Sequence, residues 1–184
     1  MLKIKKIIVD AGHGPNTVGK RSPDGTLKEF AFNKAVAQLV KQLISIEDVC
    51  VIFTHDDTHD VPLNERIKLA NGLKVDGYIS IHANAFGTDW NEVHGIETFT
   101  CLHAQKITKD LAKSVQKALI KETGRKDRGV KQRDFAVLRE TTMPAILVEC
   151  GFMTNKQEMK LLRSLIYQKQ CAQAIAQGVL RWLL

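Results

Sequence analysis

The chain has 184 residues, of which 44% are hydrophobic, and a formal net charge of +7 at pH 7. This length and composition are sufficient for one well-buried core, and no low-complexity tract divides the chain, so we expect a single domain over residues 1–184. No apolar run approaches the length of a membrane-spanning helix, and the stretch after the basic opening MLKIKK is too short for a signal peptide. We therefore expect no membrane insertion and no export signal.

Apolar strand-like runs alternate with amphipathic helical patterns, which is typical of an α/β sheet covered on both faces. The patterns predict strands at residues 4–9, 49–54, 77–81, 96–101, 135–138 and 145–149. They predict helices at 29–46, 63–73, 107–121 and, as two pieces around Ser164, at 156–184. The expected fold is thus a central twisted mixed sheet of about six strands, flanked on both faces by about five helices.

Part of the positive charge gathers in the segment GRKDRGVKQR, residues 124–133. Such an excess favours polyanionic partners such as nucleic acid, an anionic membrane or an acidic wall polymer, without choosing among them. The segment has no aromatic residues of the kind that stack on bases. A solvated surface is the more common role of such a segment.

The sequence motifs of three other kinds of site are incomplete or absent. Residues 14–20 match G-x-x-x-x-G-K, yet Arg21 stands where a phosphate-binding loop needs Ser or Thr, and the following SPDG breaks any helix. No G-x-S-x-G motif of a serine hydrolase is present. The four cysteines (Cys50, Cys101, Cys150 and Cys171) show no C-x-x-C pair, and we interpret them, including Cys150, as small core residues of a reduced protein.

Two histidines directly follow apolar runs: His13 in IIVDAGHG and His82 in YISIHANA. Each should stand at the carboxyl end of a strand, where open α/β sheets place their sites. Glu29 begins a predicted helix, Glu149 ends the apolar run ILVE, and Asn84 follows His82 on the same face. Two histidines and one carboxylate leave a tetrahedral position free, which is the composition of a hydrolytic zinc site.

From the residues alone, an ordinary structural role stays open for each of these side chains. A histidine after a strand is more often a hydrogen-bonded loop residue, and a glutamate at a helix start commonly stabilises the helix dipole. The remaining histidines have no comparable strand-end context, and we interpret them as surface residues: His55, His59, His94 and His103.

Several collinear motifs resemble the zinc-dependent N-acetylmuramoyl-L-alanine amidases of the type 3 family, which includes autolysins, sporulation lysins and phage endolysins. They are VDAGHG, Glu29 four residues before Asn33, the run with Leu63, Arg66, Ala70 and Asn71, SIHANA, GIETF and VLRETTMPAILVECGFMTN. The resemblance covers about residues 5–184. His55 stands where the family often has Arg, which we expect to affect only a local surface contact.

The resemblance implies a fold like that of the zinc exopeptidases and phosphorylase-hydrolases, and one zinc ion held by His13, Glu29 and His82. It implies that Glu149 is the catalytic base, which takes a proton from the attacking water and returns it to the leaving nitrogen. The bond broken would join N-acetylmuramic acid to L-alanine in bacterial peptidoglycan. Asp10 either orients a ligand histidine from behind or caps the following turn.

Two other function classes stay open: a zinc peptidase acting on wall peptides, and a basic polyanion-binding module. For the amidase we expect peptidoglycan as the partner, no nucleic acid, and a monomer. We expect action at the bacterial cell wall, reached from the cytoplasm by lysis or a holin, or as one domain of a longer secreted protein. The sequence does not distinguish a phage origin from a bacterial one, and it does not indicate which peptidoglycan chemotype is cut.

Overall fold

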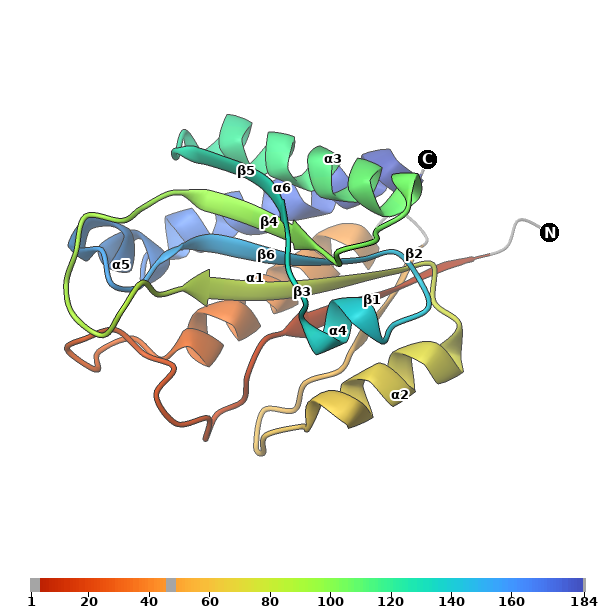
Figure 1. The fold of residues 1–184 in the computed structure, drawn as a ribbon, viewed down its shortest axis with the longest axis horizontal. Coiled ribbons are helices and arrows are strands. Elements are labelled where there is room, and N and C mark those ends of the chain that lie inside the picture. The colour runs from red at the N-terminus through yellow and green to blue at the C-terminus, as the bar shows by residue number, and fades with distance from the viewer. Residues whose placement is uncertain (1–3, 46–48, 184) are drawn as a thin grey trace.

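A six-stranded sheet runs through the residues that the computed structural model describes, 4–45 and 49–183 (Figure 1). Its strands are β1 (Lys5–Ala11), β2 (Val49–Phe53), β3 (Gly77–Asn84), β4 (Ile96–Thr100), β5 (Asp127–Gln132) and β6 (Ala145–Phe152). They lie in the order β2-β1-β3-β6-β4-β5. All neighbours are parallel except β4 and β6, so the sheet is mixed. The carboxyl ends of β1, β3 and β6 therefore meet at one edge.

Helices cover both faces of this sheet (Figure 1). The helices are α1 (Glu29–Ile44), α2 (Leu63–Leu73), α3 (Lys106–Thr123), α4 (Ala136–Arg139), α5 (Lys156–Leu162) and α6 (Leu165–Leu183). The long helices α1, α3 and α6 pack on one face around the larger apolar core, whereas α2 and the short α4 cover part of the other. Beyond α2 and α4, towards the carboxyl ends of β1, β3 and β6, the second face is lined by polar side chains.

Strand alternation separates the two faces chemically. In β3, Ile79 and Ile81 join the core under α1 and α6, while Ser80 and His82 point to the opposite face. In β6, Val148 joins the same core, and Glu149 points away from it. Because successive side chains of a strand point to opposite faces, the same strands line a buried core on one face and a polar edge on the other.

The expected fold class is confirmed, with a mixed six-stranded sheet and helices on both faces. Two element predictions were wrong. Residues 135–138, predicted as a strand, lie at the short helix α4, because the run FAVL is equally compatible with one buried helical turn. The strand β5 was not predicted, since its sequence DRGVKQ lacks an apolar run. The predicted ends of the first and last helices, residues 46 and 184, lie outside the described residues.

The cysteines divide into two kinds. Cys150 and Cys171 are fully buried, as expected, but Cys50 is exposed and Cys101 half-buried, so the prediction of core cysteines was wrong for these two. Cys50 is on β2, which is an edge strand, and alternate side chains of such a strand point towards solvent. Among the described residues, no helix is long and apolar enough to cross a bilayer.

Three basic side chains of the segment 124–133 form ion pairs with buried carboxylates. Arg125 pairs with the buried Glu158, with 3.0 Å between Nη2 and Oε1. Arg128 and Lys131, on β5, both pair with the buried Glu97 of β4. These three basic side chains therefore join strands and helices while staying partly exposed, whereas Lys126 and Arg133 are exposed, so the expected solvated surface is confirmed for part of the segment.

Candidate metal centre

His13 lies in a tight turn directly after β1. Its φ of 66° is in the left-handed region, which a residue with a side chain adopts only when its surroundings hold it there. A Cβ atom on Gly12 would lie 2.1 Å from Cε1 of His82, and one on Gly14 would lie 2.2 Å from Oδ1 of Asp60. Gly12 therefore lets the turn lie against His82, and Gly14 lets it lie against Asp60.

Glu29 is the first residue of α1 and is buried, with 4% of its surface exposed. Its carboxylate accepts hydrogen bonds from the backbone N–H of Ala83 (3.3 Å) and from Nδ2 of Asn33, one helical turn later (3.4 Å). Asn33 also donates to the carbonyl of Gly12 (3.0 Å). These contacts join the start of α1 to the ends of β1 and β3, and so aim the carboxylate across the edge of the sheet.

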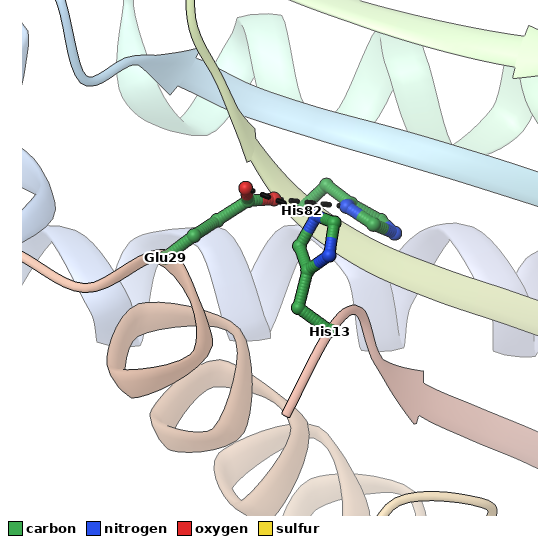
Figure 2. A group of neighbouring side chains, drawn as sticks. All are labelled: His13, Glu29 and His82. Carbon is green, nitrogen blue, oxygen red and sulfur yellow. Dashed lines mark hydrogen bonds and ion pairs between the residues drawn. The ribbon is translucent and has the colours of Figure 1, made fainter. Parts of the chain in front are cut away.

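The two imidazoles converge on the two oxygens of this carboxylate (Figure 2). Nε2 of His13 lies 3.1 Å from Oε2 of Glu29, and Nδ1 of His82 lies 2.9 Å from Oε1. The rings meet edge to face with centroids 5.0 Å apart. One ligand atom from each of the three residues lies within 4.8 Å of the others, so the group could hold a metal ion. The structure thus brings together the three residues that the sequence predicted as ligands.

The charges of this group favour a cation. Burial raises the pKa of Glu29, but hydrogen bonds and the charges of His13 and His82 outweigh it and hold the pKa well below its ordinary value. Burial lowers the pKa of His82, but the hydrogen bond with Glu29 and the negative charges of Glu29, Glu149 and Asp10 together raise it above its ordinary value. Glu29 is therefore ionised, as a metal-ligating carboxylate must be.

Glu149 lies opposite His82 in the pairing of β6 with β3. It is 8% exposed, and its Oε2 atom has no hydrogen-bond partner in the structure. Burial is the largest cause that raises the pKa of this carboxyl, to about 8. An unpartnered buried oxygen with a perturbed pKa, beside a candidate metal centre, is typical of a group that acts on a ligand.

A cavity of about 750 Å³ joins these residues. It opens over the carboxyl ends of β1, β3 and β6. Its walls come from the loop before α1, the start of α2, and the segment around α4, and they include Thr17, Lys20, Leu63 and Phe135 as well as all four candidate residues. The volume is sufficient for a ligand several residues or rings in size.

Asn84 lies at this edge too, as the sequence suggested, but its side chain donates to Oε1 of Glu97 (2.8 Å). A register shift in the pairing of β3 and β6 falls between His82 and Asn84. Sequence reasoning missed Glu97, which lies directly opposite Glu149 in the antiparallel pairing of β4 and β6. Its signal, a glutamate inside the apolar run of GIETF, resembles that of Glu149 within ILVE.

The chain is similar to known proteins over nearly its full length. A family model described as N-acetylmuramoyl-L-alanine amidase matches residues 7–181. The crystal structure of an N-acetylmuramoyl-L-alanine amidase from Clostridium difficile 630 is 36% identical, with a TM-score of 0.92 over 97% of this chain and 96% of that one. The amidase LytC of Bacillus subtilis is 32% identical over 96% of this chain, and the endolysin of Bacillus phage SPP1 33% identical over 95%.

This chain belongs to the N-acetylmuramoyl-L-alanine amidase family. The predicted resemblance is thereby confirmed, together with the assignment to this class of enzyme. The chain spans 35% of the length of LytC and 65% of that of the endolysin. The described architecture is that of an amidase catalytic domain.

Two alternatives do not fit the structure of this amidase. The G-x-x-x-x-G-K run forms a loop in which Asp60 accepts hydrogen bonds from the backbone N–H of Asn16 and the hydroxyl of Thr17, and no helix follows it directly. Cys150 points away from the cavity into the core under α6, and the neighbouring Cys171 and burial raise the pKa of its thiol well above the ordinary value. Neither segment is built for phosphate binding or nucleophilic attack.

The reading of His55 as a surface residue was wrong. His55 is half-buried against Phe53, and its Nδ1 atom accepts the backbone N–H of Ala11 at 3.1 Å. This bond fastens the last residue of β1, two positions before His13. His59 is exposed as expected, and His94 is half-buried with a bond to the carbonyl of Glu92.

Proposed function

We propose that this chain hydrolyses the amide bond between N-acetylmuramic acid and L-alanine in bacterial peptidoglycan, with one zinc ion held by His13, Glu29 and His82. The observation that carries the proposal is the convergence of these three side chains on one point beside Glu149. Membership of the amidase family supports the bond that is broken. The cavity above the group supports a substrate larger than a single amino acid.

The donor set fits zinc. Two imidazole nitrogens and one carboxylate are the three protein ligands of many catalytic zinc sites, which keep a fourth position open. Glu29 is buried and ionised, and it meets both histidines, so the negative charge lies where a dication would be held. A zinc ion bound there would polarise the scissile carbonyl and make water a stronger acid.

Glu149 is the proposed general base. Its Oε2 atom accepts the proton of the attacking water, and the same carboxyl then donates that proton to the departing alanine nitrogen. The burial that raises its pKa makes it a stronger base, because its protonated form is then more stable. Expulsion of an amine without this proton would be the difficult step.

The chemistry is tested on purified sacculi, with products separated by liquid chromatography and identified by mass spectrometry. We expect glycan strands without peptide, and stem peptides with a new free N-terminal alanine. Cross-links between peptides should remain intact. Cleaved cross-links without new N-terminal alanine would instead support the zinc peptidase, and binding without either product would support the polyanion-binding module.

We further propose that residues 1–184 act as one catalytic domain at the cell wall, as a monomer. The match of a single family model to residues 7–181 supports this unit. Light scattering of the purified chain, at the concentration used in the assay, should give the mass of one copy.

A further inference from the structure

A second group of polar side chains is buried beneath the candidate metal centre. At its middle is Asp10, which is 1% exposed. Its Oδ1 atom accepts hydrogen bonds from Thr54 Oγ1 (2.6 Å) and Arg66 Nη1 (2.7 Å), and its Oδ2 atom accepts one from Ser80 Oγ (2.7 Å). Burial raises the pKa of Asp10, but the guanidinium of Arg66 and these hydrogen bonds hold it below its ordinary value. Asp10 is therefore an ionised acceptor with both oxygens occupied.

Ser80 connects this carboxylate to His82. The Ser80 hydroxyl has one proton, and Asp10 can only accept, so that proton lies on the Asp10 side. Oγ of Ser80 is 3.1 Å from Nε2 of His82, and must therefore accept from it. Consequently Nε2 of His82 carries a proton. Without a metal, Nδ1 donates to the ionised Glu29 at 2.9 Å, so it is the nitrogen that would release its proton to bind a metal ion.

Arg66 connects the same carboxylate to His13. This side chain is 2% exposed, and besides Asp10 it donates to the carbonyls of Ala11 (2.7 Å) and Val61 (2.9 Å). It also donates through Nη2 to the carbonyl of His13. That bond holds the left-handed residue from behind, while its ring points to Glu29.

We propose that the buried Asp10–Arg66 pair positions both histidines of the metal centre, His82 through the hydroxyl of Ser80 and His13 through its backbone carbonyl. Asp10, Ser80 and Arg66 are positioning residues, and none of them is a proposed metal ligand. Of the two roles considered for Asp10, orienting a histidine and capping a turn, the contacts favour the first. The inference rests on the proposed zinc function.

The first test compares Ser80→Ala with Thr54→Val. Both substitutions remove one hydroxyl that donates to Asp10, but only the first cuts the connection to His82. We expect the zinc dissociation constant, measured by competition with a chromogenic chelator, to rise about 10- to 100-fold in Ser80→Ala. In Thr54→Val it should change by less than about threefold. Equal changes in the two variants would overturn the connection through Ser80.

A spectroscopic signal separates positioning from a general loss of stability. In the zinc-loaded parent, the Nε2–H proton of His82 should give a slowly exchanging, downfield imidazole resonance, because Ser80 accepts it. The resonance should persist in Thr54→Val and in Ser80→Thr, which keeps the hydroxyl, and should move upfield or exchange away in Ser80→Ala. Persistence of the unshifted signal in Ser80→Ala would contradict the proposal.

Asp10→Asn provides an independent variant. Arg66 can only donate, so the amide oxygen must take the Oδ1 side and the amide nitrogen must face Ser80. Ser80 then accepts from the amide and turns its proton towards Nε2 of His82, which favours a proton on Nδ1, the nitrogen needed for the metal. We expect zinc affinity to fall about 10- to 100-fold with the fold retained by circular dichroism. Unchanged affinity in a folded Asp10→Asn variant would overturn the role of Asp10.

The Arg66 branch is tested with Arg66→Lys. Lysine keeps the positive charge beside Asp10, but its single ammonium group cannot reach the carbonyls of Ala11, His13 and Val61 together. We expect weaker zinc binding and faster hydrogen exchange at the amides that follow β1. Parent-like exchange and affinity would overturn this branch. If the parent itself bound no zinc, the proposed function would fail, whereas a zinc-binding parent with unaffected variants would refute only the positioning.

Discussion

The two faces of the sheet are made from the same strands, but they differ in almost every property. Under α1, α3 and α6 the strands present a continuous apolar layer, for example Ile79, Ile146 and Val148. On the other face, at the carboxyl ends, the same strands present Asp10, His82 and Glu149. The first face supplies stability through burial, and the second places charged groups in a partly open cavity, at a cost in stability. The comparison predicts that substitutions on the two faces affect different measurements.

The largest expected effect is on the reaction rate, from Glu149→Gln. The substitution keeps the size of the side chain but removes the base, so hydrolysis of purified muropeptides should fall by about 10²- to 10⁴-fold. Bound zinc, measured by atomic absorption, should stay at the level of the parent, because Glu149 is not a proposed ligand. Turnover near the parent rate would show that the proposed division between ligands and base is wrong.

His13→Ala should lose both zinc and activity. It removes one of three proposed ligands, and the remaining His82 and Glu29 cannot complete the set. Treatment of the parent with a chelator should have the same effect on activity, and added zinc should restore the parent but not the variant. His59→Ala is the matched control, since His59 is exposed and outside the cavity. Full zinc content in His13→Ala would exclude His13 as a ligand.

On the apolar face, Ile146→Ala should affect stability instead of chemistry. Ile146 is fully buried on β6, three residues before Glu149, in the core under α6. We expect the free energy of unfolding to fall by about 2 to 5 kcal/mol, through lost burial and the cavity left behind. Zinc affinity of the folded protein should be that of the parent. A large loss of zinc affinity would mean that the two faces are not independent.

Glu149→Gln should also stabilise the zinc-free protein. Burial raises the pKa of Glu149 from its ordinary 4.5 to about 8, so between these pH values the folded chain holds a proton that the unfolded chain releases. The stability of the parent therefore falls as pH rises from about 4.5 to 8, and glutamine removes this fall. We expect a gain of about 1 to 3 kcal/mol at pH 8 by urea unfolding. A loss of stability at pH 8 would contradict the raised pKa.

The sequence predicts the polar edge better than it predicts the sheet that carries it. His13, His82 and Glu149 each end an apolar run, and Glu29 begins an amphipathic helix, so their places in the pattern made them candidates, and the resemblance to the amidase family supplied their roles. β5 gave no comparable signal, because Arg128 and Lys131 point to Glu97 and the strand has little apolar content. The contact of Asp10 with Arg66, 56 positions apart, depends on the packing of α2, and its contact with Ser80 depends on the register of β1 and β3, and no local pattern contains either.

The smallest effect concerns acid stability, and it compares Asp10 with Glu149 on the same face. Both carboxyls are buried, but Asp10 has the guanidinium of Arg66 and two hydroxyl donors, so its pKa lies below the ordinary 3.8 instead of above it. Its contribution to stability is therefore complete above pH 3.8 and is lost as pH falls through the lower pKa of the folded state. Below about pH 4, we expect the unfolding free energy of zinc-free Asp10→Asn to fall less steeply with pH than that of the parent. The two slopes should differ by the uptake of at most one proton on unfolding. Urea unfolding between pH 6 and pH 2 measures this, and a variant with the parent's slope would show that Arg66 does not stabilise the charge of Asp10. The sign is opposite to that of Glu149 because a buried charge that is fully paired favours folding, whereas one left without partners opposes it.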